Sequence, residues 1–415
     1  MSDGDHSKFP DNQKDEVRYL QAKDIKNHFI ENNNPVFISK EYFDKNKRSH
    51  IKEENVILSI MGSVGDIAIT PKGFKPSLAN RAVAIIKEIT DVNPYYLFTY
   101  LSTKFGQLQI NRQKNGGVQV RINLDVLSKV KIPYIHKGFQ LKIEGIVKLA
   151  HKTKGEFQVK YRESEELLLK EIGLRNFEPS KEPVNIKNFA ESFGVSGRLD
   201  AEYYQSKYDD YLRLIFDYSD GYEELSTACN LHNKNFKPEE NTEYKYIELS
   251  NVGKSGEING CTNEIGKNLP SRARRKVSEG DVVVSSIEGS LDSCALVTNE
   301  YNGSLCSTGF YVINSNKINS ETLLILFKSE LMQNILKQNC SGTILTAINK
   351  DEFLKIPIPL IDLTKQIQIA ELVEQSFKLK KESEHLLEVA KTAVEIAIEQ
   401  NEAVALDFIA KNAVS

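Results

Sequence analysis

The alternation of apolar and polar positions follows the same course twice along this chain. The pattern of residues 17–143 recurs in residues 244–369, at first 227 and later 226 residues further on. Arg18-Tyr19-Leu20 matches Lys245-Tyr246-Ile247 near the start of each copy. The apolar positions and turn glycines recur, whereas most polar identities differ. Two copies of one fold with different surfaces indicate one task performed on two different targets.

Short runs rich in Val, Ile and Tyr, bounded by Gly, Asn, Ser or Pro, predict strands in each copy. They are Val17–Leu20, Asn55–Met61, Ile67–Thr70 and Arg81–Ile86, and then Tyr244–Leu249, Asp281–Ser286, Cys294–Thr298 and Gly309–Ile313. A helix is predicted after each set. The first is Pro94–Thr103 with Asn93 as its cap, and the second is Ser320–Leu336 with Ser320 as its cap. A Gly-bearing loop and an extended piece ending in Ile-Pro complete each copy.

After each Ile-Pro the apolar period becomes helical, over Gly138–Ile172 and over Thr364–Ala410. In the second stretch Leu372, Leu379 and Leu386 lie seven residues apart, a spacing that favours coiled-coil pairing. A lone amphipathic helix more often packs on its own domain. Two such helices, each following an equivalent domain, are expected to pack on each other.

These patterns predict an α/β (α+β) fold with two tandem domains of mixed β-sheet plus helices and two long helices. The expected divisions are 1–137 and 197–363 for the domains, 138–175 and 364–412 for the long helices, and 176–196 for a linker that contains Pro179 and Pro183. Residues 194–243 have no counterpart before residue 17. We therefore expect the first domain to lack this lead-in segment, which would lie upstream of the sequence or be truncated.

Charge is distributed unevenly along the chain, although its formal net value is only −3. Residues 17–143 carry 20 Lys and Arg against 10 Asp and Glu, a net charge of +10. Residues 244–369 carry 13 of each, and residues 370–415 carry 5 against 9, which gives 0 and −4. A local excess of +10 favours a polyanionic partner such as nucleic acid. The alternative is a basic surface without a specific role.

Composition places the chain among soluble globular proteins, with 40% hydrophobic and 27% charged residues. No apolar run approaches the roughly 18 residues of a membrane span, and the polar stretch Met1–Glu16 does not resemble a signal peptide. The five cysteines are scattered without a C-x-x-C pair, which indicates reduced thiols rather than a metal or disulfide site. We therefore expect a cytoplasmic protein with no membrane partner.

The most specific polar feature is a basic cluster that recurs at the same place in both copies. Its members are Lys45, Lys47, Arg48 and Lys52, and then Arg272, Arg274, Arg275 and Lys276. Arginine can bond guanine edges with two parallel hydrogen bonds, and both residue types can hold phosphates. A solvated surface loop is the alternative. Because the cluster persists where neighbouring identities change, contact with nucleic acid is the favoured interpretation.

A Gly-Ser turn also recurs, as Gly62-Ser63 and Gly289-Ser290. The first copy has a further glycine at Gly65, so its backbone amides could hold a phosphate. The second copy has only one glycine there, which favours a plain hairpin turn. Polar loop residues of the first copy are candidate base readers: Asn80, Arg81, Gln119 and Arg121.

Catalytic motifs are missing from the sequence. Asn93-Pro94-Tyr95-Tyr96 faintly resembles the Asn-Pro-Pro-Tyr of amino-methyltransferases, but it lacks the second proline and fits a helix cap better. The chain has no G-x-G-x-x-G, Walker loop or H-E-x-x-H, and its seven histidines are scattered. We expect no catalytic residue and no metal site.

The repeated blocks resemble the specificity (S) subunit of type I restriction–modification systems over about residues 17–410. The resemblance rests on four features: Val56–Asp66 with Val283–Leu291, Gly117–Pro133 with Gly342–Pro359, the helix starts at Gln140 and Gln366, and Arg198-Leu199-Asp200-Ala201-Glu202-Tyr203-Tyr204. Each motif is weak, but two copies in this order, each followed by a long helix, are specific.

This resemblance implies two target-recognition domains that each read one half of a split, asymmetric site in double-stranded DNA. It also implies that the long helices pair antiparallel and dock two methyltransferase (M) subunits, which motor-nuclease (R) subunits can join. S-adenosylmethionine and ATP with Mg²⁺ would then act only in the partner subunits, and the S subunit would be non-catalytic. A helix of about 35 residues spans roughly 50 Å, or about one and a half turns of B-DNA.

Three other interpretations stay open from the sequence alone. The chain could be a structural adaptor, or a truncated and inactive specificity subunit. It could also be a DNA methyltransferase with a degenerate motif, which binding of S-adenosylmethionine by the isolated chain would reveal.

Overall fold

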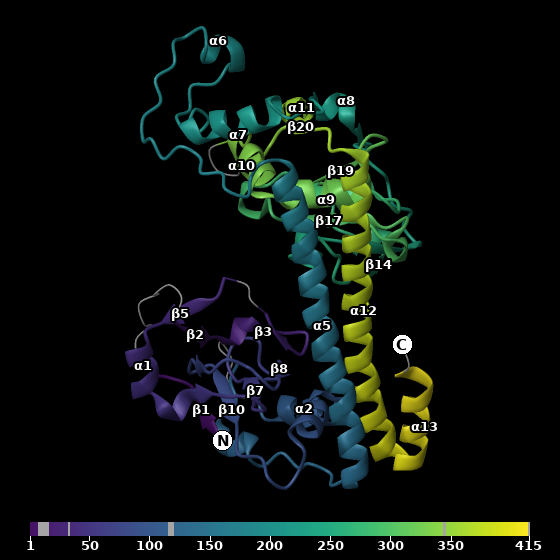
Figure 1. The fold of residues 1–415 in the computed structure, drawn as a ribbon. Helices are drawn as coiled ribbons and strands as arrows, with labels where there is room; N and C mark the ends of the chain where they lie inside the picture. The colour runs from purple at the N-terminus through teal and green to yellow at the C-terminus, as the bar shows by residue number, and fades with distance from the viewer. Residues whose placement is uncertain (7–15, 32–33, 115–119, 343–345, 414–415) are drawn as a thin grey trace. The chain divides into compact units, whose positions relative to one another are not determined.

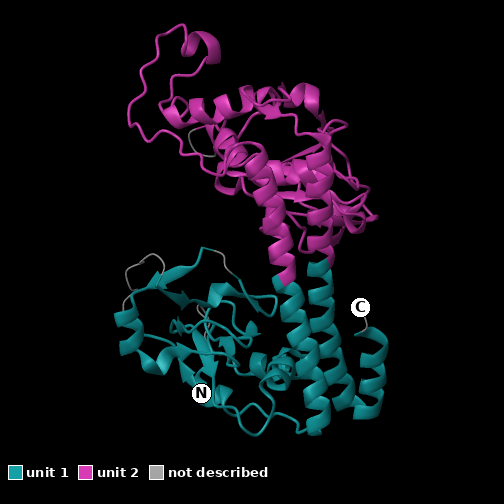
Figure 2. Cartoon of the chain, in the orientation of Figure 1, with its two compact units in different colours: residues 1–155, 379–415 teal, residues 156–378 magenta. Residues whose placement is uncertain are grey.

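The computed structural model describes residues 1–6, 16–31, 34–114, 120–342 and 346–413 (Figure 1). The chain forms two compact units (Figure 2). Unit 1 contains Met1–Gly155 together with Leu379–Ser415, and unit 2 contains Glu156–Lys378. Each of the two long helices therefore contributes one part to each unit.

Unit 1 contains two four-stranded sheets. The first is antiparallel, in the order β1-β10-β7-β8, with β1 Ser2–Asp3, β7 Val56–Ser59, β8 Ile67–Ile69 and β10 Val83–Ile86. The second is mixed, in the order β5-β2-β9-β6, with β2 Val17–Leu20, β5 Val36–Ile38, β6 His50–Ile51 and β9 Ser77–Ala79. The hairpin of β3 (Ile25–Lys26) and β4 (Phe29–Ile30) and the short helices α1 (Lys40–Lys45) and α4 (Leu124–Leu127) complete the strands and loops.

Unit 2 repeats this design. Its antiparallel sheet has the order β12-β19-β16-β17, with β12 Asn230–Leu231, β16 Val282–Ser285, β17 Cys294–Leu296 and β19 Phe310–Asn314. Its mixed sheet has the order β14-β13-β18-β15, with β13 Glu243–Ile247, β14 Thr262–Ile265, β15 Ala273–Lys276 and β18 Leu305–Ser307. Additional elements are α6 Phe193–Ser196, α7 Ser206–Phe216, α8 Leu225–Ala228, α11 Lys350–Lys355, and the strand pair β11 Tyr222–Glu224 with β20 Pro357–Pro359. The predicted repeat and mixed α/β class are thus confirmed.

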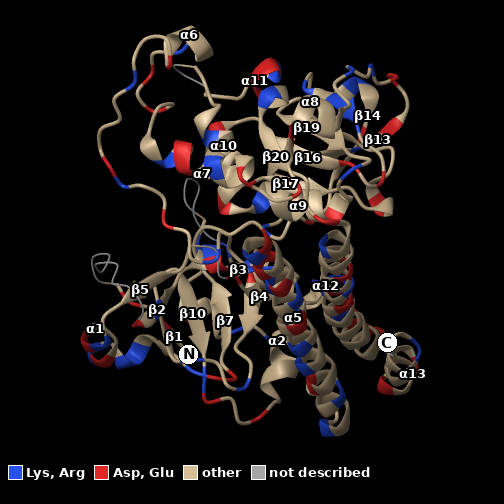
Figure 3. Ribbon diagram, turned by 45° about the horizontal axis from the view of Figure 1, so that its top comes forward, with Lys and Arg blue, Asp and Glu red and all other residues tan. Residues whose placement is uncertain are grey.

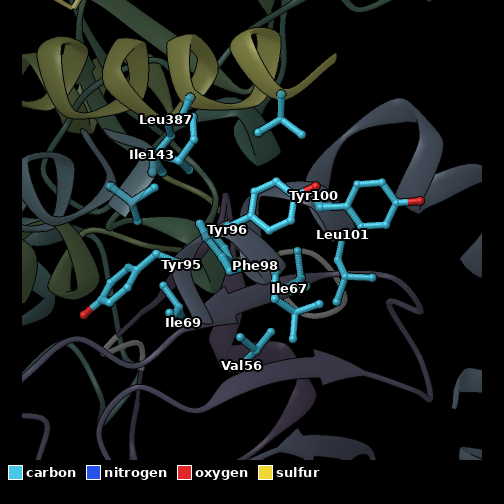
Figure 4. Close-up of a cluster of buried hydrophobic side chains, with 14 of the residues drawn as sticks. Val56, Ile67, Ile69, Tyr95, Tyr96, Phe98, Tyr100, Leu101, Ile143 and Leu387 are labelled. Carbon is cyan, nitrogen blue, oxygen red and sulfur yellow. The ribbon is translucent and has the colours of Figure 1, made fainter. Parts of the chain in front are cut away.

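The antiparallel sheet of unit 1 is buried on both faces, which explains its uninterrupted apolar strands. Val56 and Leu58 pack toward α2 (Pro94–Ser102), whereas Ile57 packs toward the mixed sheet. Figure 4 shows the α2 side of this core, where Tyr96 and Phe98 lie between the sheet and the long helices. Unit 1 therefore has three layers: helices, antiparallel sheet and mixed sheet.

The helix after the strands is interrupted in both copies. In unit 1, Asn93 caps α2 by accepting hydrogen bonds from the backbone N–H groups of Tyr95 and Tyr96, at 2.9 and 3.3 Å, as predicted. Thr103 then caps a second helix, α3 (Lys104–Arg112).

In unit 2 the predicted cap at Ser320 is wrong. Asn319 caps α9 (Ser320–Lys328) through the N–H of Thr322, because an amide oxygen one residue earlier reaches that donor. The predicted continuous helix also ends early. Ser329 caps a separate helix, α10 (Glu330–Gln338).

The two long helices are α5 (Lys137–Glu171) and α12 (Leu363–Glu399). In unit 1 the Ser383 hydroxyl donates to the carbonyl of Ala150 at 2.8 Å. In unit 2 the Lys365 ammonium lies 3.6 Å from the Glu171 carboxylate. Residue numbers fall along α12 as they rise along α5, so the helices run antiparallel (Figure 1).

The predicted apolar stripe of α12 is confirmed in its second part, where Leu386 and Ala390 are buried. In its first part the prediction is wrong, because Leu372 and Leu379 are only half-buried, whereas Ser376 and Ser383 are buried. Small side chains at the buried positions let the two backbones approach closely, as the bond from Ser383 to Ala150 requires.

The predicted helix Thr364–Ala410 is broken after Glu399. Asn401 accepts a hydrogen bond from Val404 N–H at 3.0 Å and so starts a separate helix, α13 (Glu402–Asn412). Helix α13 returns along α12, because its Asn412 carbonyl lies 3.0 Å from the His385 ring nitrogen. The apolar period continues through this break, so the sequence pattern did not predict it.

One strand of the lead-in segment has a counterpart in unit 1. Strand β1 pairs with β10 at the sheet edge, just as β12 pairs with β19 in unit 2. The expectation that nothing before residue 17 matches residues 194–243 is therefore wrong for this edge strand. Among the described residues, unit 1 has no equivalent of α7, β11 and α8.

All five cysteines are free thiols, and burial raises the pKa of the Cys294 thiol to about 11. No helix among the described residues is long and apolar enough to cross a membrane.

Candidate nucleic-acid interface

Three segments of unit 1 meet at the end of the antiparallel sheet and form what we call turn edge 1. They are residues 60–65, 80–82 and 121–122. Ile60 N–H donates to the Ala82 carbonyl at 2.8 Å, and Ile122 N–H donates to the Ile60 carbonyl at 3.0 Å. Met61 and Arg121 form a β-bridge. The backbone therefore holds three loops together that are far apart in the sequence.

The corresponding turn edge 2 of unit 2 consists of residues 286–290, 308–309 and 346–348. Ser286 N–H donates to the Gly309 carbonyl at 2.9 Å, and Ile348 N–H donates to the Ser286 carbonyl at 2.8 Å. Ile287 and Ala347 form the equivalent β-bridge. The two turn edges thus share one backbone arrangement.

Turn edge 1 contains four of the predicted contact residues. Ser63, Arg81 and Arg121 are exposed. Asn80 is half-buried, and its side-chain oxygen accepts a hydrogen bond from Ala82 N–H at 3.1 Å. Gln119 lies outside the described residues. One polar surface therefore presents two arginines and a serine.

The Gly-Ser turns connect antiparallel strands, as expected for hairpins. Gly62 and Gly65 have φ values of +78° and +106°, which favour glycine. In unit 2 the Ser290 hydroxyl lies 3.0 Å from that of Ser285 and donates to the Ile287 carbonyl at 3.3 Å. Ser290 is thus engaged within its own turn.

Gln107 and Gln333 support the turn edges and were missed in the sequence analysis. The Gln107 amide donates to the carbonyls of Gly65 and Leu101, at 3.1 and 2.9 Å. Gln333 donates to the equivalent carbonyls of Leu291 and Phe327, at 3.1 and 2.7 Å. Both glutamines occupy the same position in the repeat, so retained polar identity was the signal that could have revealed them.

The basic cluster of unit 1 lies on α1 and on the 3-10 turn Lys47–Ser49 that follows it, except for Lys52, which follows β6 (Figure 3). Lys45 pairs with Glu41 at 2.5 Å on the exposed face of α1. Arg48 is 72% exposed and pairs with Asp3 at 2.7 Å. Both cations therefore have a carboxylate neighbour that a phosphate would have to displace.

A cleft of about 540 Å³ opens beside this cluster. Lys47 and Lys52 line it together with Lys87 and His50. Lys87 donates to the Arg48 carbonyl at 3.2 Å. It could not be found from sequence spacing, because the pairing of β10 with β7 brings the end of β10 to this cleft. Glu53 and Glu88 also line the cleft, so three lysines face two carboxylates, and the small excess of positive charge favours an anionic ligand such as a backbone phosphate.

Three members of the basic cluster of unit 2 lie in strand β15 and Arg272 directly precedes it, so the local structure differs from that of unit 1. Tyr19 and Tyr246 lie opposite Leu78 and Leu305, which makes those leucines equivalent. His50 pairs with Leu78 and Lys276 pairs with Leu305, so the offset here is 226 residues. The predicted 227-residue register of the cluster is wrong at this strand, which has an irregularity between Ala273 and Arg275.

The arginines of this second cluster differ in their surroundings. Arg272 is 61% exposed, pairs with Glu248 at 2.9 Å and is linked through its carbonyl to Thr308 N–H of turn edge 2. Arg274 donates to the Ser271 carbonyl at 2.9 Å. Arg275 donates to the Asn235 side-chain oxygen at 2.9 Å, and burial lowers the pKa of its guanidinium.

Lys276 lies over the Phe236 ring at 5.5 Å. Of the four basic residues in this cluster, Arg272 is thus the one that the backbone connects directly to turn edge 2.

A family model of the type I restriction modification DNA specificity domain matches residues 5–148 and 224–389, one stretch in each repeat. The matched class is therefore a DNA specificity domain present twice. The chain belongs to this family, that of the specificity subunits of type I restriction–modification systems.

Individual relatives are distant. The specificity subunit of the type I restriction enzyme EcoBI from Escherichia coli is 24% identical over 123 residues, which are 30% of this chain and 26% of that relative. The match thus spans about a quarter of that relative.

Two solved structures are also similar. The type I restriction–modification S subunit from M. genitalium has a TM-score of 0.45 and 12% identity, with 94% of this chain and 91% of that chain covered. The HsdS subunit from Thermoanaerobacter tengcongensis has a TM-score of 0.29 and 14% identity, with 93% and 90% covered.

Proposed function

We propose that this chain is the DNA sequence-recognition subunit of a type I restriction–modification complex, in which each unit reads one half of a split, asymmetric site. The observation that carries this proposal is the pair of turn edges. They share one backbone arrangement but differ in side chains, because Arg81 and Arg121 correspond to Thr308 and Ala347. Side chains that differ on one backbone would select different bases.

Basic residues outside the turn edges would hold the phosphates. We assign this role to Lys47, Lys52 and Lys87 around the cleft of unit 1, and to Arg272 in unit 2. Phosphate contacts fix the register of a protein on the duplex without reading sequence.

The long helices would dock two methyltransferase subunits, and motor-nuclease subunits would join in complexes that cleave DNA. Exposed apolar side chains on these helices support a protein partner there. Leu141 and Val159 on α5 are 53% and 48% exposed, and Ile367 on α12 is 51% exposed. The chain would supply no catalytic group, so S-adenosylmethionine and ATP with Mg²⁺ would act in the partner subunits.

The test is the methylation pattern of a genome in cells that express this chain with its cognate methyltransferase, compared with cells that lack the chain. We expect a new motif of two short, unequal halves with a fixed gap. New methylation at a single continuous motif would contradict recognition by both units. No new methylation, with the methyltransferase shown to be bound, would contradict the recognition role altogether.

A further inference from the structure

In unit 2, helix α7 and strand β11 cover α10 and β20. Strand β11 pairs antiparallel with β20, with Glu223 opposite Ile358. Tyr208, Tyr211 and Ile215 of α7 are at most 1% exposed, and α7 packs on α10. The Tyr211 hydroxyl donates to Glu330 on α10 at 2.6 Å. This helix–strand segment, Ser206–Glu224, thus completes both an edge strand and a helix face.

The repeat identifies the same surface in unit 1. Helix α3 corresponds to α10, and residues 131–133 correspond to β20, each with an offset of 226 residues. No strand pairs with residues 131–133 in the part of unit 1 that the structure describes. The Gln109 side chain bonds the backbone N–H and carbonyl of Lys131, both at 2.9 Å, so it secures this edge against its own domain.

Apolar side chains on this surface of unit 1 are exposed, although α13 packs on the same unit. Ile132 is 37% exposed, whereas its counterpart Ile358 is fully buried. Leu108 on α3 and Tyr134 are 65% and 75% exposed. We call Leu108, Ile132 and Tyr134, with the edge at 131–133, the acceptor surface. An unpaired edge flanked by exposed apolar groups favours binding of an added strand.

We propose that the acceptor surface of unit 1 binds a helix–strand segment with the chemistry that Ser206–Glu224 has in unit 2. The strand would pair antiparallel with residues 131–133, and the preceding amphipathic helix would lie on α3 over Leu108. Main-chain hydrogen bonds would provide affinity, and the aromatic face of the helix would provide fit.

Charge complementarity also favours this occupant. Residues 206–224 carry 2 Lys and Arg against 6 Asp and Glu, a net charge of −4. Residues 104–134, which contain the acceptor surface, carry 6 against 1, a net charge of +5. An acidic helix–strand segment is therefore suited to this basic, partly apolar surface. Nucleic acid would match the charge but not the exposed Leu108, Ile132 and Tyr134.

The experiment measures binding of a labelled peptide to the intact chain by fluorescence anisotropy. The peptide has the sequence of residues 203–226, and a scrambled peptide is the control. We expect saturable binding of one peptide per chain, weakened at least about tenfold by Leu108→Glu or Ile132→Glu. Leu149→Glu, which changes another exposed leucine of unit 1, should leave binding unchanged.

A disulfide test examines the strand register. The pairing of Glu223 with Ile358 predicts that Ile132→Cys in the chain cross-links to a Glu223→Cys peptide. Peptides with cysteine at position 222 or 224 should cross-link less.

No peptide binding to the unaltered chain, or binding that survives both Leu108→Glu and Ile132→Glu, would overturn the proposal. Loss of duplex binding in these two variants without peptide binding would assign the surface to nucleic acid and also overturn it. The outcome is independent of the recognition role, since methylation patterns are not part of the readout.

Discussion

At the scale of the residue, polar identities that both repeats retain have structural roles. Gln140 and Gln366 are 3% and 4% exposed, and each accepts a hydrogen bond at 2.7 Å from the backbone N–H of the asparagine that caps the preceding helix. Side chains at the turn edges differ between repeats, as Arg121 and Ala347 do. The two retained glutamines thus belong to the scaffold, whereas the turn edges differ in the side chains that they expose.

His151 gives unit 1 a sensitivity to acid that we expect to measure. Its ring lies 5.1 Å from that of Phe29, and no described residue bonds its Nε2 atom. Burial, and secondarily Lys154, lowers the pKa of His151 to about 4. In the unfolded chain this histidine binds a proton below about pH 6.5, whereas in the folded chain it does so only near pH 4. The stability that depends on a neutral His151 is therefore complete above about pH 6.5 and is lost as the pH falls toward 4.

His151→Phe should remove this part of the acid sensitivity. Phe377 occupies the equivalent position of the second repeat, so a phenyl ring fits this kind of site. Urea denaturation would measure the free energy of unfolding at pH 7.5 and at pH 5. The loss between these two pH values should be smaller for the variant than for the unaltered chain, by about 1 kcal/mol or more. Burial also lowers the pKa of His28, which is present in both proteins, so the variant should keep part of the acid sensitivity. An unchanged difference would contradict this role of His151.

At the scale of the element, the sequence predicts where a segment starts better than where it is interrupted. The period and the Asn93 cap predicted α2 and, within one residue, both ends of α5. The breaks at Ser329 and Asn401 could not be predicted, because the apolar period continues through them. At each break a side-chain oxygen accepts a hydrogen bond from a backbone N–H group that would otherwise bond a carbonyl within the helix. Which of the two acceptors is used depends on the tertiary structure.

In the candidate site, too, some residues could be predicted from the sequence and others could not. Arg81 and Arg121 stand out in the sequence as polar loop residues, and the structure brings them to one turn edge. The position of Lys87 at the same cleft as Lys52 depends on the pairing of β10 with β7, which no local pattern encodes. Gln107 could have been found by comparing the two repeats for retained polar residues.

Gln140→Leu and Gln366→Leu should each loosen the junction between a domain and a long helix. Gln140 also donates to the Ile135 carbonyl at 2.7 Å, so its loss leaves a buried donor and a buried acceptor unpaired. We expect each substitution to lower the free energy of unfolding by about 2 kcal/mol or more. Hydrogen exchange should rise at the start of α2 in the first variant and of α9 in the second. Gln400→Leu, at an exposed position, serves as the control.

At the scale of the whole molecule, the two units share one architecture but not one charge. The first repeat has a net charge of +10 and the second of 0, so phosphate attraction would contribute more to DNA binding by unit 1. Unit 2 would then depend more on individual contacts such as that of Arg272. Division of the task between units predicts that damage to one turn edge leaves the other half-site intact.

Arg121→Ala in unit 1 and Arg272→Ala in unit 2 test this division directly. Each arginine is exposed and lies in or next to one turn edge, so neither substitution disturbs a core. If Arg121 reads a base, its loss should relax one position in one half of the methylated motif, at a cost of about 1–3 kcal/mol in discrimination. If it holds a phosphate, affinity should fall for all sequences and the salt dependence should weaken by about one charge. Arg272 is assigned to a phosphate, so its variant should lower affinity for all sequences without relaxing either half of the motif. Each variant is thus the control for the other, and relaxed positions in both halves from one substitution would mean that the units do not read DNA independently.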